Sequence, residues 1–189
     1  MNLAAFDNQS AFRALMDATA RPGTIKVLEG RDAPLPLMPA TAALIASLAD
    51  FETPVWLDPA LAQVTAVVEW VRFTTGAPLT DDPQQAAFAL VADARTLPDF
   101  EDFAQGSEEY PDRSTTVIAQ IGRFAGEAFT LSGPGLKEPR ILAAGPLPPD
   151  FAARCAANRA LFPRGIDLIL VADDRIAALP RSVRIAARD

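Results

Sequence analysis

The sequence predicts an α/β fold in which a mixed β-sheet is flanked by helices. Predicted helices and strands alternate through the first half of the 189 residues, and predicted strand pairs dominate the second half. Half of the residues are hydrophobic, which is enough for a sizeable core. The length is that of one ordinary domain, so we expect residues 1–189 to form a single domain.

The first predicted helix ends at Arg21-Pro22-Gly23, because Pro cannot continue a helix and Gly accepts a turn. Four residues at i, i+3, i+4 and i+7 predict one core-facing stripe: Phe12, Leu15, Met16 and Thr19. Three polar residues are candidate caps for its start: Asp7, Asn8 and Ser10. Residues 24–28 then predict a short strand.

A second helix is predicted over residues 40–49, and a brief extended segment over residues 53–57. Asp58-Pro59 is typical of a helix start, with Asp as the N-cap and Pro at the first helical position. One apolar face follows on that helix: Leu61, Val64, Val68 and Val71. Residues 87–91 predict a strand.

Residues 115–122 and 128–131 read as two strands paired around a turn at residues 123–127. Residues 149–161 predict a helix with three candidate core contacts: Phe151, Cys155 and Leu161. Two strands then flank a polar turn at Asp173-Asp174, and residues 183–186 predict a final strand.

Residues 93–112 carry seven acidic residues and one basic residue, a local net charge of −6 out of the total of −7. A solvated loop containing a short helix is the simplest interpretation. A surface for a basic partner is the alternative.

Composition excludes several classes of function. The chain has no histidine, which removes Ser–His and Cys–His nucleophile schemes and most zinc sites, so we expect no metal. The single Cys155 excludes an internal disulfide and suits a reducing compartment. The negative net charge argues against nucleic acid and anionic membranes as partners. The polar N-terminus does not read as a secretory signal, and the longest uncharged run, residues 33–49, is interrupted by Pro34, Pro36 and Pro39, so we expect a cytoplasmic protein.

Asp167 is unusual because it begins an aliphatic run, Ile166-Asp167-Leu168-Ile169-Leu170-Val171, that predicts a central strand. If residues 172–175 form a hairpin loop, Asp167 lies opposite Pro180 and close to Arg181. Strict alternation would put Arg181 on the opposite face, so an ion pair would need a bend. We expect Asp167 to be anchored at the sheet end by Arg181, Arg13 or loop N–H groups; contact with a ligand or partner is the alternative.

The segment Ser132-Gly133-Pro134-Gly135-Leu136-Lys137-Glu138-Pro139-Arg140 follows a predicted strand. Gly133 and Gly135, with the cations Lys137 and Arg140, could wrap an anion. A tight turn is the default interpretation, because the spacing matches neither a Walker loop nor a dinucleotide fingerprint.

Two further features bear on cofactors and partners. Pyridoxal chemistry needs a Schiff-base lysine, and the two lysines, Lys26 and Lys137, lack a supporting motif, so we expect no cofactor. Trp56 lies in a short extended segment, where it is either a core residue or an anchor at an interface.

Six stretches, spread over nearly the whole chain, occur in the order of a known family: Phe12-Arg13-Ala14-Leu15-Met16, Arg21-Pro22-Gly23-Thr24-Ile25, Asp50 with Thr53-Pro54-Val55-Trp56-Leu57, Gly133-Pro134-Gly135, residues 162–170 and Leu179-Pro180-Arg181. Taken in order, these stretches resemble the H-subunit (PhnH) family of the bacterial carbon–phosphorus lyase core complex.

The resemblance implies a fold like that of pyridoxal-phosphate-dependent transferases, without the cofactor or its lysine. It implies a homodimer that joins the G, I and J subunits in phosphonate catabolism. With the G, I and L subunits, such a chain supports formation of ribose 1-phosphonate 5-triphosphate from a purine nucleoside triphosphate and an alkylphosphonate. The acidic segment at residues 93–112 departs from the family pattern in its charge, so no contact is carried over to it.

Three functional interpretations follow. The leading one is an accessory subunit of a multi-subunit enzyme, with no catalytic residue identified and no activity expected of the isolated chain. The second is a self-sufficient transferase with its site at the strand ends near Asp167 and the glycine turn, where Arg13 and Arg181 would clamp the phosphate or phosphonate oxygens of a nucleotide or phosphonate. The third is a purely structural scaffold. Candidate contact residues are the following: Arg13, Trp56, Gly133, Gly135, Asp167 and Arg181.

Overall fold

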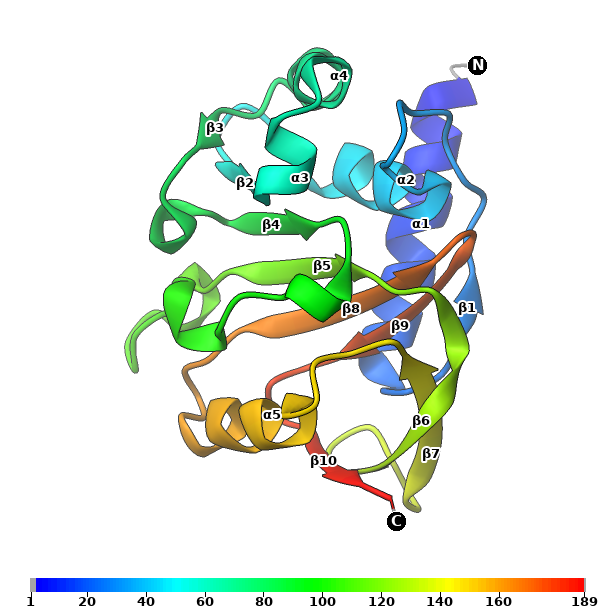
Figure 1. The fold of residues 1–189 in the computed structure, drawn as a ribbon, viewed down its shortest axis with the longest axis vertical. Coiled ribbons are helices and arrows are strands. Elements are labelled where there is room, and N and C mark those ends of the chain that lie inside the picture. Colours follow the sequence, from blue (N-terminus) through cyan, green and yellow to red (C-terminus); the bar gives the residue numbers. More distant parts are fainter. Residues whose placement is uncertain (1–2, 189) are drawn as a thin grey trace.

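A computed structural model describes the backbone of residues 3–188 and the side chains of residues 8–188. The strands form two sheets (Figure 1). A seven-stranded mixed sheet has the order β1-β9-β8-β5-β4-β2-β3, and a three-stranded sheet has the order β10-β6-β7. The predicted α/β class with a mixed sheet flanked by helices is therefore confirmed, whereas the second sheet was not predicted.

Parallel pairing joins the five strands β8, β5, β4, β2 and β3, and antiparallel pairing adds β9 and then β1 at one edge. The strands of this sheet have these bounds: β1 Lys26–Val27, β2 Val55–Leu57, β3 Leu79–Thr80, β4 Phe88–Val91, β5 Thr116–Gln120, β8 Asp167–Ala172 and β9 Arg175–Leu179. The second sheet contains β6 Arg123–Ser132, β7 Arg140–Gly145 and β10 Arg184–Ala187, all antiparallel.

The helices divide between the two faces of the large sheet. Their bounds are α1 Leu3–Ala20, α2 Pro39–Leu48, α3 Pro59–Ala62, α4 Thr65–Thr75 and α5 Phe151–Ala160. Residues of α1 to α4 share one apolar cluster with Ile169 and Val171 of β8. Leu168 and Leu170, the alternate residues of that strand, pack into a second cluster with α5 and the small sheet. Because successive strand residues point to opposite faces, β8 is covered on both sides, as its aliphatic run predicts.

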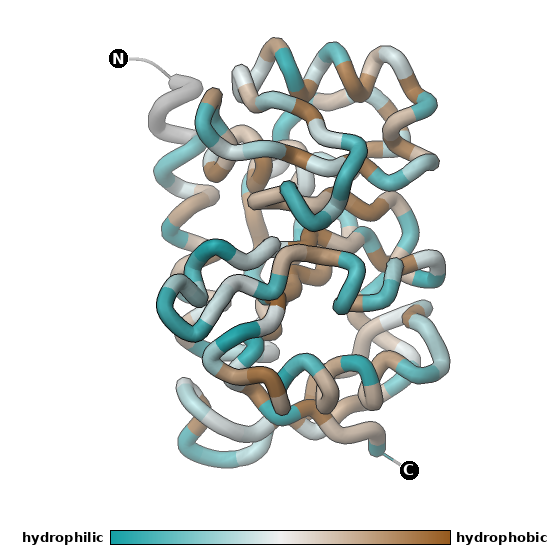
Figure 2. The backbone as a smooth tube through the Cα atoms, turned by 90° about the vertical axis from the view of Figure 1, so that its left-hand side faces the viewer, coloured by the Kyte–Doolittle hydropathy of each residue, from teal (hydrophilic) through white to brown (hydrophobic). Residues whose placement is uncertain are grey.

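The tube in Figure 2 shows this layering by hydropathy. Hydrophobic stretches lie mainly in the interior, where the central strands run, and hydrophilic stretches lie mainly at the periphery. No helix in the described part of the chain is both long and apolar enough to cross a membrane.

The stripe predicted for α1 is only partly correct. Leu15 is buried, but Phe12 and Met16 are 46% and 52% exposed, and Thr19 is exposed. Two small residues, Ala11 and Ala18, take the buried positions instead, because α1 packs closely against α2 and β9. The predicted caps are wrong, since the helix begins at Leu3 and all three residues lie inside it.

Asp58 caps a helix as predicted, accepting a hydrogen bond from the Leu61 N–H at 2.8 Å. The single helix expected there is divided into α3 and α4 at Gln63–Val64. Of the residues in the predicted apolar face, Leu61 and Val71 are buried, and the other two pack partly buried against the same cluster.

The predicted pairing of residues 115–122 with residues 128–131 is wrong. β5 pairs instead with β4 and β8, and β6 pairs with β7 and β10. The expected turn at residues 123–127 belongs to β6, where the register shifts between Arg123 and Ala128. Ile118 and its neighbours Val117 and Ala119 are buried on opposite faces, so β5 behaves as a central strand.

The acidic segment forms three short 3-10 turns, η2 Ala94–Thr96, η3 Phe100–Asp102 and η4 Pro111–Arg113. Its apolar side chains enter the core: Leu97, Phe100 and Phe103. The acidic side chains are partly or fully exposed, which agrees with the solvated interpretation. An ion pair of 2.8 Å between Asp99 and Arg154 ties the segment to α5.

The C-terminal predictions are largely confirmed. Phe151 and Cys155 of α5 are buried, whereas Leu161 is 37% exposed just beyond the helix. Val171 pairs with Ile176, the register expected for the β8–β9 hairpin, although the loop between the strands contains only Asp173 and Asp174.

Candidate functional site

The carboxyl edge of the parallel strands is the usual ligand site of an open α/β sheet. Here two buried polar side chains at that edge bind the chain's own backbone. Asp58 follows β2, and besides capping α3 it accepts a hydrogen bond from the Ala92 N–H at 2.9 Å. Its carboxylate oxygens are therefore both occupied.

Gln120 ends β5 and is 2% exposed. Its amide donates to the carbonyls of Pro36 (2.9 Å) and Ala92 (3.2 Å), and its carbonyl oxygen accepts from the Met38 N–H at 2.6 Å. These bonds hold the proline-rich loop at residues 33–38 over the strand ends. The sequence analysis missed Gln120, because its three partners lie far from it along the chain.

Asp167 and Arg181 meet at the opposite end of β8. The Arg181 guanidinium donates from Nη2 to Asp167 Oδ2 at 2.5 Å and from Nε to Oδ1 at 3.2 Å. The Arg181 backbone N–H donates to Oδ1 at 2.8 Å. Asp167 thus accepts a bidentate pair and a backbone bond, so the predicted anchor is present.

The expected bend is also explained. β9 ends at Leu179, which pairs with Leu168, and Pro180 then begins a turn closed by the Val183 N–H on the Pro180 carbonyl. Arg181 therefore lies beyond the strand, where alternation of faces no longer applies.

Arg181 also holds two other segments in place. Its Nη1 donates to the carbonyls of Pro111 (2.8 Å) and Pro163 (3.4 Å), and Nη2 donates to Ser114 Oγ. The side chain is only 12% exposed. Arg181 therefore ties the acidic segment, the β8 strand and the turn before it together. Ser114 and the two carbonyls were not predicted, and no local pattern signals them.

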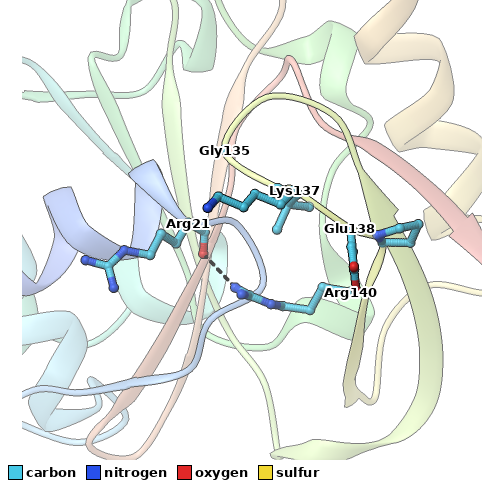
Figure 3. Close-up of a pocket in the computed structure, with 7 residues that line it drawn as sticks. Arg21, Gly135, Lys137, Glu138 and Arg140 are labelled. Carbon is cyan, nitrogen blue, oxygen red and sulfur yellow. Dashed lines mark hydrogen bonds between the residues drawn. The ribbon is translucent and has the colours of Figure 1, made fainter.

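The glycine loop between β6 and β7 borders a hollow of about 520 Å³ (Figure 3). The hollow is lined by Arg21 and by residues 135–140. Gly133 and Gly135 have φ of 126° and 83°, a region that favours glycine. A Cβ on Gly135 would lie 2.5 Å from the Ala20 carbonyl oxygen, so the loop can sit against the end of α1 only with glycine there.

Arg140 is fixed to the chain after α1. Its Nη1 donates to the carbonyls of Arg21 (3.3 Å) and Pro22 (3.2 Å) and to the hydroxyl of Thr24. Its Nε and Nη2 have no acceptor among the described residues. One edge of this guanidinium is thus held by the protein, and the other edge is open.

The remaining charged groups of the hollow are Lys137, Glu138 and Arg21. Figure 3 shows the Lys137 and Arg140 side chains extending toward the backbone of Arg21, whose own guanidinium points away from the loop. Arg21 pairs with Asp17 at 2.5 Å, and Lys26 pairs with the same carboxylate. The hydrogen bond from Lys26 holds the pKa of Asp17 below its ordinary value. Among the described residues, Lys137 and Glu138 form no ion pair.

The other candidate residues lie apart from both places. Arg13 is exposed on α1 and forms no recorded bond with Asp167 in the described part of the chain. Trp56 is half-buried and packs edge-on against Phe103, with ring centroids 5.7 Å apart. Burial raises the pKa of the Cys155 thiol to about 12, as expected for a packed core thiol. Within residues 8–188, no three potential metal ligands cluster.

The chain is similar to known proteins over most of its length. The model of a family described as bacterial phosphonate metabolism protein (PhnH) matches residues 2–186. The alpha-D-ribose 1-methylphosphonate 5-triphosphate synthase subunit PhnH of Rhizobium meliloti (strain 1021) is 43% identical over 182 residues, which is 95% of this chain and 90% of that protein. A putative C-P lyase subunit protein, HtxG, of Stutzerimonas stutzeri is 36% identical over 81 residues, 42% of each chain.

Proposed function

The chain belongs to the PhnH family of bacterial phosphonate metabolism proteins, and from this premise we propose that it is a subunit of the carbon–phosphorus lyase core complex. The observation that carries the proposal is the similarity to a named synthase subunit over 95% of the chain and 90% of that subunit. In this role the chain supports formation of ribose 1-phosphonate 5-triphosphate from a purine nucleoside triphosphate and an alkylphosphonate, together with the G, I and L subunits.

The proposal includes partners and location. We place the chain in the cytoplasm, as a homodimer that joins the G, I and J subunits. Phe12 and Met16 support burial against another chain, because they lie one turn apart on α1 and are each about half exposed. A mass of 20.1 kDa in gel filtration at micromolar concentration would contradict the homodimer.

We also propose that residues 1–189 act as one domain related to the pyridoxal-phosphate-dependent transferase fold. The mixed sheet with helices on both faces supports this relationship. No cofactor is part of the proposal: Lys26 of β1 pairs with Asp17 of α1, and Lys137 lies in the glycine loop.

Two observations favour an accessory role over a self-sufficient transferase at the strand ends. The Arg181 guanidinium already binds Asp167, and Arg13 forms no hydrogen bond or ion pair with Asp167 among the described residues. Among groups that could act as nucleophiles, the Cys155 thiol is buried with a raised pKa, and no histidine is available to activate another.

Co-expression tests the proposal. The chain is produced with the G, I and J subunits, with an affinity tag on one of those, and the purified material is assayed for the ribose 1-phosphonate product after adding the L subunit. We expect this chain to co-purify and the product to form only when it is present. Product formed at the same rate without this chain, or by the isolated chain alone, would contradict the accessory role.

A scaffold without any ligand contact predicts a different outcome. Under that interpretation, substitutions at polar residues of the glycine loop leave both assembly and product formation unchanged.

A further inference from the structure

The guanidinium groups of Arg140 and Arg181 are held by the backbone in the same way, but their second edges differ in whether they have an acceptor. Each guanidinium donates from Nη1 to two backbone carbonyls that lie far along the chain. In Arg181 the other edge, Nε with Nη2, grips both oxygens of the Asp167 carboxylate. In Arg140 the corresponding edge has no acceptor among the described residues. An arginine fork of this kind fits two oxygens of a carboxylate, phosphate or phosphonate.

The surroundings of the Arg140 fork favour an anion. Lys137 extends into the same hollow and forms no ion pair among the described residues. The backbone N–H groups of Gly135, Lys137 and Glu138 likewise have no acceptor within residues 3–188. The Leu136 N–H between them donates to the Gly133 carbonyl, so Lys137 and Glu138 supply two successive unpaired amides, a feature typical of anion-binding loops. Glu138 is the one acid among the lining residues, against Lys137 and Arg140, since the Arg21 guanidinium points away and pairs with Asp17.

The size and charge of the hollow limit the ligand. A volume of about 520 Å³ accommodates a small molecule, and the chain as a whole carries −7, so an extended polyanion would be repelled outside this spot. The fork also presents parallel donors, which fit a tetrahedral oxyanion through two of its oxygens.

We propose that this hollow binds the terminal phosphoryl or phosphonyl group of a small molecule, with Arg140 gripping two oxygens and Lys137 and the loop amides binding the rest. Arg140 is prepared for this contact, because its Nη1 bonds fix the guanidinium before the ligand arrives. The choice of probe ligands rests on the proposed function, whereas the oxyanion class rests on the geometry.

Calorimetric titration of the purified full chain tests the inference. The probes are methylphosphonate and inorganic tripolyphosphate, which stand for the two possible sources of the oxyanion. We expect saturable binding of at least one, and the tighter of the two identifies the source. Absence of binding by both probes at millimolar concentration would overturn the proposal.

Three variants locate the binding. Arg140→Lys keeps the charge but removes the fork, and Lys137→Gln removes an exposed charge without disturbing a recorded contact; each should weaken binding about tenfold. Arg72→Gln is the matched control, since it removes an exposed charge on α4, at the other end of the molecule in Figure 1. If Arg140→Lys does not fold, Lys137→Gln carries the test alone.

Weakening by Arg72→Gln equal to that by Lys137→Gln would overturn the proposal, because it would show a general charge effect. This binding assay uses the chain alone, so its failure leaves the co-purification result unaffected, and loss of co-purification leaves the binding result unaffected.

Discussion

The sheet end at Arg181 and the glycine loop at Arg140 each contain an arginine held by backbone carbonyls, but among the described residues only one of the two has an internal carboxylate as its partner. In both, an arginine is fixed through Nη1 to carbonyls from distant parts of the chain. At the sheet end an internal carboxylate closes the fork, and the side chain is 12% exposed. At the loop the fork is open beside a hollow. An arginine's partners therefore decide, more than its position near a sheet end or a glycine turn, whether it is structural or available to a ligand.

The largest effect is expected from Arg181→Ala. It removes the bonds to three segments and leaves the half-buried Asp167 carboxylate without its cation, so the free energy of unfolding should fall by about 2–4 kcal/mol. Asp167→Asn should lower the free energy of unfolding by a smaller amount, because the Asn side-chain carbonyl still accepts one hydrogen bond. Urea unfolding measures both changes. An unchanged unfolding midpoint for both variants would contradict a structural role for the Asp167–Arg181 pair.

The reactivity of the Cys155 thiol gives a second measure of how tightly the sheet end near Arg181 is closed. Cys155 and Arg181 line the same small cavity, and burial raises the thiol pKa to about 12. At pH 8 the Cys155 thiol of the native chain should therefore react with a thiol reagent only when the surrounding structure opens transiently. Labelling should be much slower than in the urea-unfolded chain. Arg181→Ala should speed labelling, and Arg140→Lys should not. Rapid labelling of the native chain would mean that this end is not closed.

The raised thiol pKa also sets a direction for stability at alkaline pH. The folded state retains its proton where the unfolded thiol, with a pKa of about 9, has lost it. This contribution to stability is complete below pH 9 and is lost as pH rises from about 9 to 12. Cys155→Ser should flatten that part of the pH profile of the unfolding free energy.

Gly135→Ala is expected to disturb the loop next. The new Cβ would meet the Ala20 carbonyl at 2.5 Å, and φ is positive, so we expect a loss of about 2–3 kcal/mol and weaker anion binding. Gly76→Ala is the matched control, because Gly76 also has a positive φ but its Cβ would meet nothing within 4 Å. The control should cost about 1 kcal/mol. Equal losses in the two variants would show that the close approach to α1 is unimportant.

The smallest effect concerns the rim of the open site. Asp17→Asn removes the carboxylate that holds the Arg21 guanidinium at the end of α1, so oxyanion affinity should rise about two- to threefold. The titration with methylphosphonate and tripolyphosphate measures this change. Weaker binding in the variant would show that Arg21 does not contribute from this side.

The sequence predicted features set by neighbours along the chain. The Asp58 cap, the β8–β9 register and the Asp167–Arg181 anchor all involve local pairs or one hairpin. Arg140 was recognised only as a cation after a glycine turn, because its partners lie more than a hundred residues away. The same limit explains the wrong partner assigned to β5, whose true neighbours come from β4 and β8. The α1 stripe was only partly correct, because close helix packing favours alanine over larger apolar residues.

Arginine Nε–H resonances in the ¹⁵N-labelled chain distinguish the open Nε–Nη2 edge of Arg140 from the edge of Arg181 that Asp167 closes. The Arg140 and Arg181 signals are identified by their loss in Arg140→Lys and Arg181→Lys. During titration with tripolyphosphate or methylphosphonate, this difference predicts a saturable shift of the Arg140 Nε–H signal and a stationary Arg181 signal. An Arg140 signal that does not move, or two signals that move together, would contradict it.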